Sequence, residues 1–280
     1  MMRGTVLSQG QHKVDAPTSI VDAQGEDLQV QIAPDVRIEG PVRVRGKRNR
    51  LILDAGVRLG SYIPAGLSVS EYDAGGGAHA GLVLEGEDNT VEISAGARLG
   101  VNLVIQGSGN RVVIGRDCQL RGLMNLLGSQ SHLTIGAGTT MVQGSLQLHE
   151  PGEIRIGADC MISSQVYVSL SDIHPIYDRA NGKRINPAAS VIIGDHVWLG
   201  LRSLVLKGAN IGDGAVVAAG AMVTGQVPSH VIVAGVPGKV MRENIEWRRD
   251  FSQGAPEPPG EIMSTGRKHV WPLFRRRRLP

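Results

Sequence analysis

The chain of 280 residues contains 38 glycines and only 3% aromatic residues, a composition that favours thin stacked coils over a wide globular core. Its formal net charge of +3 is small and its basic residues lack interleaved aromatic ones, which gives no support to nucleic-acid binding. The sequence has no run of 18 apolar residues, no signal-peptide pattern and only two cysteines, so we expect a cytoplasmic protein.

The first 27 residues show no aliphatic register, and we expect them to form an arm or an N-terminal cap. From about residue 28 onward, one large aliphatic residue recurs every 21 residues. The exception is the step from Leu53 to Ile93, which equals two coils less two residues. This frame contains Ile32, Leu53, Ile93, Ile114, Ile135 and Ile156. A fixed repeat of this length predicts a solenoid, because the apolar period of an α-helix is 3.6 residues.

The period drops to six residues from Ile193 onward. Branched aliphatic residues occupy one position of this unit, namely Ile193, Leu199, Val205, Ile211, Val217 and Val223. Small residues or valine follow four places later, namely Val197, Ser203, Ala209, Ala215, Ala221 and Val227. Such a unit fits one flat side of a three-sided coil, with the aliphatic residue inside and the small residue at a corner. The longer coils add about three residues at one corner, where GEDN, GSGN and GSQS supply turn residues.

The two cysteines test this register, because Cys118 and Cys160 follow Ile114 and Ile156 by the same four residues. They are two coils apart, which separates their backbones by roughly 10 Å at the usual strand spacing. That distance is beyond the reach of a disulfide bond. We therefore predict two buried, reduced thiols that fill small inward positions.

Two insertions interrupt the all-β solenoid that the pattern predicts over residues 28–236. The first covers about residues 61–80 and is rich in glycine and alanine, and the second, at about 170–190, is polar and carries a histidine. Residues 237–250 are predicted to form a capping helix. Residues 251–280 are predicted to form a basic tail, which is either a solvated, disordered end or a weak contact for an anionic membrane surface or an acidic glycan.

His174 is the candidate for chemistry because it lies in the polar second insertion. A neutral imidazole can accept a proton from a hydroxyl group, and a nearby carboxylate such as Asp172 or Asp178 could fix its tautomer. The alternative is an ordinary surface histidine. Trp198 is an outward-facing aromatic residue in a chain with few of them, and it covers a ligand, covers a neighbouring subunit or packs on the adjacent coil.

Residues 154–247 resemble the hexapeptide-repeat acyltransferases, specifically the branch of maltose/galactoside acetyltransferases and capsular-polysaccharide O-acetyltransferases. The resemblance rests on SDIHPIYD, RINP, VIIGDHVWLG, VLKGANIGDGAVVAAGAMVTGQVP and VAGVPGKVMRENIEW, in this order. It implies a left-handed parallel β-helix that assembles as a homotrimer, with active sites between adjacent subunits. It also implies acetyl-CoA as the acyl donor and no metal.

The resemblance assigns roles to individual residues. His174 would be the general base on the acceptor hydroxyl. The acetyl-CoA site would comprise Trp198, Gly200, Ala219, Gly220, Thr224, Lys239 and Arg242, the last two near the nucleotide phosphates. The substrate-binding candidates are Asp172, Tyr177, Arg184 and Asn186. Two positions depart from the family pattern: Gly225 replaces a lysine, and Leu201 replaces a serine or arginine.

The sequence thus predicts an acetyl-CoA-dependent O-acetyltransferase acting on a saccharide hydroxyl, with a cell-surface polysaccharide or its precursor as acceptor. Two alternatives remain at this point. A zinc enzyme on the same solenoid would need three histidine ligands, and no H-x4-H pair exists among the eight histidines. A non-catalytic scaffold or glycan-binding protein would keep the solenoid without the transfer activity.

Overall fold

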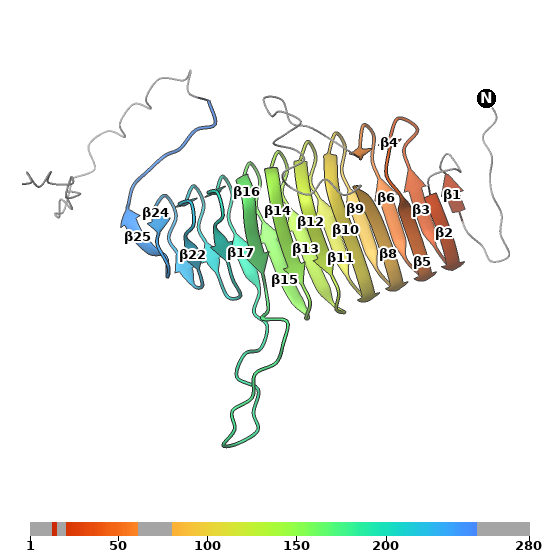
Figure 1. Cartoon of the computed structure of the whole chain (residues 1–280). Coiled ribbons are helices and arrows are strands. Elements are labelled where there is room, and N and C mark those ends of the chain that lie inside the picture. Colours follow the sequence, from red (N-terminus) through yellow and green to blue (C-terminus); the bar gives the residue numbers. More distant parts are fainter. Residues whose placement is uncertain (1–12, 16–20, 61–79, 251–280) are drawn as a thin grey trace, which may run out of the picture. The chain divides into compact units, whose positions relative to one another are not determined.

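The computed structural model describes residues 13–15, 21–60 and 80–250 as a stack of parallel β-strands (Figure 1). The chain divides after Trp247 into two compact units, and the solenoid belongs to the first. The strands of the coils pair in parallel with those one coil further along the chain, as Ile93 does with Ile114 and Ile114 with Ile135. The predicted all-β, parallel β-helix class is therefore confirmed. No helix long and apolar enough to cross a membrane occurs in the described part of the chain.

The strands form two sheets. The first follows the order β1 (Lys13–Asp15), β3 (Gln29–Ile32), β6 (Arg50–Leu53), β9 (Thr90–Ile93), β11 (Arg111–Ile114), β13 (Ser131–Ile135), β15 (Gly152–Ile156), β17 (Val191–Ile193), β20 (Asn210–Ile211), β23 (Gln226–Val227). The main path of the second is β2 (Val21–Glu26), β5 (Val42–Lys47), β8 (Gly81–Glu87), β10 (Arg98–Ser108), β12 (Gln119–Leu126), β14 (Thr140–Leu148), β16 (Met161–Ser169), β18 (Trp198–Leu199), β21 (Val216–Val217), β24 (Ile232–Ala234), β25 (Lys239–Arg242). Four short strands pair beside this path: β4 (Arg37–Ile38), β7 (Arg58–Leu59), β19 (Leu204–Val205) and β22 (Met222–Val223).

One continuous core of aliphatic side chains runs through the coils and contains the residues of the predicted register. Leu53, Ile93, Ile114 and Ile156 are at most 1% exposed. Both cysteines are free and buried as predicted, and burial raises the pKa of each thiol to about 11. The core thus forms only because successive coils stack, since a single coil has no second layer to cover its aliphatic side chains.

Buried asparagines join neighbouring coils of the N-terminal half at one corner. Asn89 donates its backbone N–H to the side-chain oxygen of Asn49 at 2.9 Å, and Asn110 donates to Asn89 in the same way. Each side-chain nitrogen donates in turn to a glycine carbonyl of the next coil, from Asn89 to Gly107 and from Asn110 to Gly128. The ladder supplies partners to backbone groups that the turn removes from the strands.

The register prediction is wrong at Val227. The sequence pattern assigns this residue to the small corner position, whereas the structure pairs it with Ile211 in the position of the large aliphatic residues. Only Thr224 and Gly225 separate β22 from β23, whereas four residues separate β19 from β20. The last corner is therefore two residues shorter than the repeat predicts.

The predicted capping helix at residues 237–250 is also wrong, since the described residues contain no helix. After Pro237 and Gly238 the chain forms β25, which pairs antiparallel with β24. The last coil leaves the edge of β24 without a following strand, and its unpaired backbone groups offer a template for pairing. The backbone groups of β25 pair with this edge, so they are not available for the hydrogen bonds of a helix.

Candidate active site

The polar second insertion leaves the solenoid after β16 and returns at β17, and it extends away from the coils as a long loop (Figure 1). His174 lies near the start of this loop and is exposed. Its backbone N–H donates to the carbonyl of Asp172 at 2.7 Å, across Ile173, which has a φ of 67°. This is a three-residue γ-turn, and a β-branched residue at positive φ is strained. Such strain persists only where surrounding contacts hold it.

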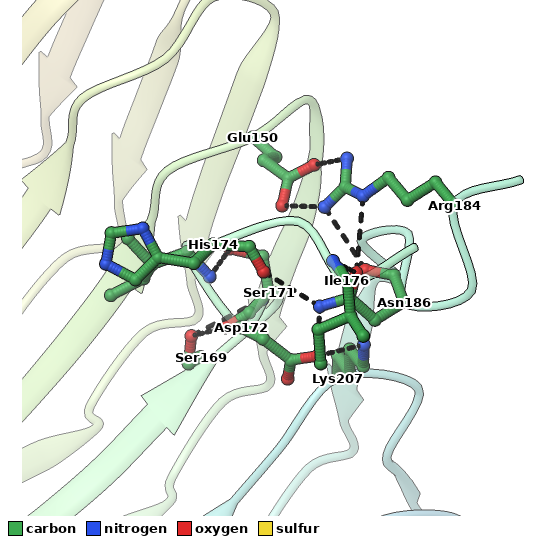
Figure 2. Close-up of polar contacts among 10 residues, drawn as sticks. Glu150, Ser169, Ser171, Asp172, His174, Ile176, Arg184, Asn186 and Lys207 are labelled. Carbon is green, nitrogen blue, oxygen red and sulfur yellow. Dashed lines mark hydrogen bonds and ion pairs between the residues drawn. The ribbon is translucent and has the colours of Figure 1, made fainter. Parts of the chain in front are cut away.

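Asn186 provides contacts that hold this turn (Figure 2). Its side chain is 6% exposed and lies at the other end of the loop. The amide nitrogen donates to the carbonyl of His174 at 2.9 Å and to the carboxylate of Asp172 at 2.8 Å. The amide oxygen accepts from the backbone N–H of Ile176 at 2.6 Å. One buried side chain therefore fixes the backbone on both sides of Pro175.

Two ion pairs attach the loop to the coils before and after it (Figure 2). Glu150, between β14 and β15, accepts two hydrogen bonds from the guanidinium of Arg184 at 2.6 and 2.7 Å. Lys207, between β19 and β20, donates to Asp172 at 2.5 Å. The Arg184 contact lowers the pKa of Glu150, and the contacts from Lys207 and Asn186 lower the pKa of Asp172. A forked guanidinium contact of this kind fixes direction as well as charge.

The imidazole of His174 points away from this network (Figure 2) and has no hydrogen-bond or ion-pair partner among the described residues. Asp172, a candidate for fixing its tautomer, instead accepts from Lys207 and Asn186. The other candidate, Asp178, accepts from Ala180 and Asn181 further along the loop. Within one chain, the carboxylates hold the loop and leave the imidazole free.

Trp198 begins β18 on the outer surface and is 36% exposed. Its indole nitrogen lies 3.4 Å from the hydroxyl of Ser163, a long hydrogen bond. The ring of Trp247 lies 6.0 Å away at an interplanar angle of 47°. Trp247 in turn stacks on His196, with ring centroids 4.0 Å apart. His196 is thus a stacking partner as well as the outward-facing residue that its register indicates.

The other residues predicted for acetyl-CoA lie on consecutive coils. Gly200 and Gly220 share one corner, where the N–H of Gly220 donates to the carbonyl of Leu201 at 2.8 Å. Gly220 has a φ of 69°, and a side chain there would meet no atom within 4 Å, so space is open above it. Ala219 and Thr224 are exposed on the same coil, and Lys239 and Arg242 are exposed on β25.

Of the substrate-binding candidates, Tyr177 is 57% exposed on the loop, where it forms an isolated bridge with Arg184. Asp172, Arg184 and Asn186 are engaged in the network that holds the loop. Sequence reasoning missed Glu150, Lys207 and Trp247. The two charged residues are far from their partners in sequence and carried no local signal, whereas the scarcity of aromatic residues could have singled out Trp247. In the described part of the chain, no group of histidine, cysteine or acidic residues could hold a metal ion.

Comparison with known proteins agrees with this architecture. Residues 190–225 match the family model for the hexapeptide repeat of succinyl-transferase. A polysialic acid O-acetyltransferase of Neisseria meningitidis is 49% identical over 74 residues, which are 26% of this chain and 34% of that protein. A polysialic acid O-acetyltransferase of Escherichia coli O1:K1 is 37% identical over 115 residues, which are 41% of this chain and 38% of that protein.

Among solved structures, the crystal structure of the polySia-specific acetyltransferase NeuO superposes with a TM-score of 0.56 at 27% identity. That match covers 84% of each chain. In sequence, by contrast, the chain spans between about a third and two fifths of the length of these curated relatives. The resemblance to the hexapeptide-repeat acyltransferases that the motifs indicate is confirmed.

Proposed function

We propose that this hexapeptide-repeat protein is an acetyl-CoA-dependent O-acetyltransferase that modifies a hydroxyl group of a saccharide. The observation that carries the proposal is the position of His174: a strained turn, held by a buried asparagine and two ion pairs, presents an imidazole that has no partner within the described part of the chain. A surface histidine without a function would not need such support. The names of the similar proteins support acetyl transfer as the reaction class. The names of the two curated relatives give polysialic acid, a polysaccharide, as an example of an acceptor.

The reaction is direct acyl transfer with His174 as general base. The imidazole takes the proton of the acceptor hydroxyl while the oxygen attacks the thioester carbonyl of acetyl-CoA. The carbon–sulfur bond then breaks, and the same imidazole returns the proton to the departing thiolate. General base catalysis is typically worth about 10² to 10⁴ in rate. Leu201 has no polar side chain, so a backbone N–H has to stabilise the oxyanion.

The donor binds along the outer surface from β18 to β25. Trp198 lines the acyl and pantetheine end of the site, and the pantetheine arm follows the corner residues. These are Gly200, Ala219, Gly220 and Thr224. The open space above Gly220 fits such an arm, and the exposed positive charges of Lys239 and Arg242 fit the nucleotide phosphates. Gly225 offers no side chain at the place where relatives carry a lysine.

On the acceptor side, Tyr177 is the candidate for direct contact with the saccharide, because its ring is exposed on the loop that carries His174. Asp172, Arg184 and Asn186 contribute by holding that loop in place. The acceptor we propose is a cell-surface polysaccharide or its precursor. The two buried reduced thiols fit a reaction in the cytoplasm. The basic tail, a candidate for weak membrane contact, lies outside the described residues.

The site is completed by a neighbouring copy of the chain in a homotrimer. Two features of the single chain support this part of the proposal. The imidazole of His174 lacks a partner among the described residues of its own chain. The loop also exposes apolar side chains that a protein surface would cover: Ile173, Ile176, Tyr177 and Ile185. Analytical ultracentrifugation at micromolar concentration tests the assembly, and a monomer would contradict it.

The activity is tested by following the release of CoA from acetyl-CoA against a panel of sugars, nucleotide sugars and acidic polysaccharides. We expect the wild type to acetylate at least one of them and His174→Ala to lose at least about 10²-fold in kcat. CoA affinity, measured by calorimetry, should be unchanged in that variant. His132→Ala is the matched control, because His132 is exposed on β13, outside the proposed site.

The same experiment separates the enzyme from a scaffold or glycan-binding protein on the same solenoid. A wild type that binds no CoA and consumes no acetyl-CoA would favour the non-catalytic alternative. A His174→Ala variant with near-wild-type turnover would refute the assignment of the base while leaving the activity in place.

A further inference from the structure

The C-terminal segment after β25 returns to the solenoid and buries Trp247 against it. The backbone N–H of Ile245 donates to the carbonyl of His230 at 3.0 Å and ties the segment to the last coil. Two residues later, Trp247 is only 7% exposed and stacks on His196 at an interplanar angle of 9°. The resemblance assigns no role to Trp247.

Reciprocal hydrogen bonds lock this stack. The indole nitrogen of Trp247 donates to the carbonyl of His196 at 2.8 Å, and Nε2 of His196 lies 3.0 Å from the carbonyl of Trp247. The other ring nitrogen, Nδ1, lies 2.6 Å from the carboxylate of Asp159 on the preceding coil. Each ring nitrogen of His196 thus faces an oxygen atom on its own side of the ring. The histidine is held from two sides, and it holds Trp247 in turn.

The stack reaches Trp198, which follows His196 by two residues. The Trp198 ring has one long hydrogen bond to Ser163 and a tilted contact with Trp247. A hydrogen bond of 3.4 Å is weak, so it does not fix the orientation of an indole that is one third exposed. The contact with the rigid Trp247 ring is the stronger constraint, since aromatic pairs at centroid distances of 4.5 to 7 Å attract each other.

We infer that Trp247 is a positioning residue for the acyl-donor slot: stacked on His196, it holds the Trp198 ring in the orientation that receives the acyl and pantetheine end of acetyl-CoA. The inference rests on the proposed function, because it gives Trp198 its role. It predicts an effect on donor binding from a residue that lies behind Trp198 and has almost no exposed surface of its own.

The test compares Trp247→Ala, Trp247→Leu and Trp247→Phe with the wild type. CoA affinity is measured by calorimetry, and KM for acetyl-CoA and kcat by CoA release. We expect the Ala and Leu variants to raise both the dissociation constant and KM by about three- to tenfold, with kcat changed less than twofold. Trp247→Phe keeps a ring on His196 and should restore most of the affinity.

A double variant decides whether Trp247 acts through Trp198. If it does, Trp198→Ala combined with Trp247→Ala binds CoA no more weakly than Trp198→Ala alone, because the shared contact is lost once. Additive losses, or wild-type CoA affinity in both the Ala and Leu variants, would overturn the inference. The Leu variant keeps the test decisive if the Ala variant does not fold. If the wild-type protein itself does not bind CoA, that result overturns the proposed function rather than the role of Trp247 alone.

Discussion

Replacing Asn186 by alanine tests how strictly the loop has to be held. The substitution removes the donors to His174 and Asp172 and the acceptor for the N–H of Ile176. At about 0.5–1.5 kcal/mol for each of these three net hydrogen bonds, the loop loses roughly 1.5–4.5 kcal/mol of support. The positive φ at Ile173 costs on the order of 1–3 kcal/mol, so the remaining contacts no longer secure the γ-turn.

We therefore expect Asn186→Ala to lower kcat by about 10²-fold, because a base displaced by about 1 Å loses that much rate. The assay is steady-state CoA release at saturating acetyl-CoA, with CoA affinity and the melting temperature measured on the same samples. Both should stay near the wild-type values, since the coils do not depend on the loop for their core. Asn181→Ala is the matched control, because Asn181 lies in the turn of the same loop at residues 179–181, and this variant should keep full activity. Turnover of Asn186→Ala within threefold of the wild type would refute the reasoning.

Two further predictions concern acid and thiol chemistry. The ion pairs lower the pKa of Glu150 and Asp172 in the folded loop. These pairs therefore stabilise the loop fully at pH values above the ordinary carboxyl pKa of about 4, and this stabilisation is lost as the pH falls through the lowered pKa values. The protection of residues 170–190 from hydrogen exchange, measured relative to the intrinsic exchange rate at each pH, should thus be constant from pH 7 to about 5 and fall below 4 before the coils unfold, and a loss of protection between pH 7 and 5 would contradict this assignment. Because Cys118 and Cys160 are buried and their pKa is about 11, neither should react with a thiol reagent at pH 8 until denaturant is added; labelling of the native protein would show that the coils open there.

The repeat alone was enough to predict the solenoid, because each coil buries aliphatic side chains at a fixed spacing. Ile114 and Ile135 occupy the interior for that reason, and Cys118 and Cys160 occupy small inward positions. The repeat fails where the chain leaves the stack. At Val227 a corner is shortened by two residues, and beyond Pro237 the free edge of β24 outweighs local helix propensity.

The site was predictable only in part. Motif order made His174 and Trp198 candidates, but the contacts around them join distant residues. Glu150 and Arg184 are 34 residues apart, and Asp172 and Lys207 are 35 apart. Their pairing depends on which corners of the coils stack on either side of the loop. The residues near each partner in the sequence carry no signal for that stacking. Asn186 remains a predicted substrate contact, and its burial and hydrogen bonds to the loop carried no signal in the sequence.

We propose that His174 meets the acyl donor in a slot shared by two copies of the chain, and a crystal structure of the protein with CoA decides whether it does. We expect a trimer in which the CoA sulfur lies within hydrogen-bond reach of the His174 imidazole, with Trp198 against the pantetheine end. CoA bound far from His174, or bound entirely within one chain, would refute this shared site.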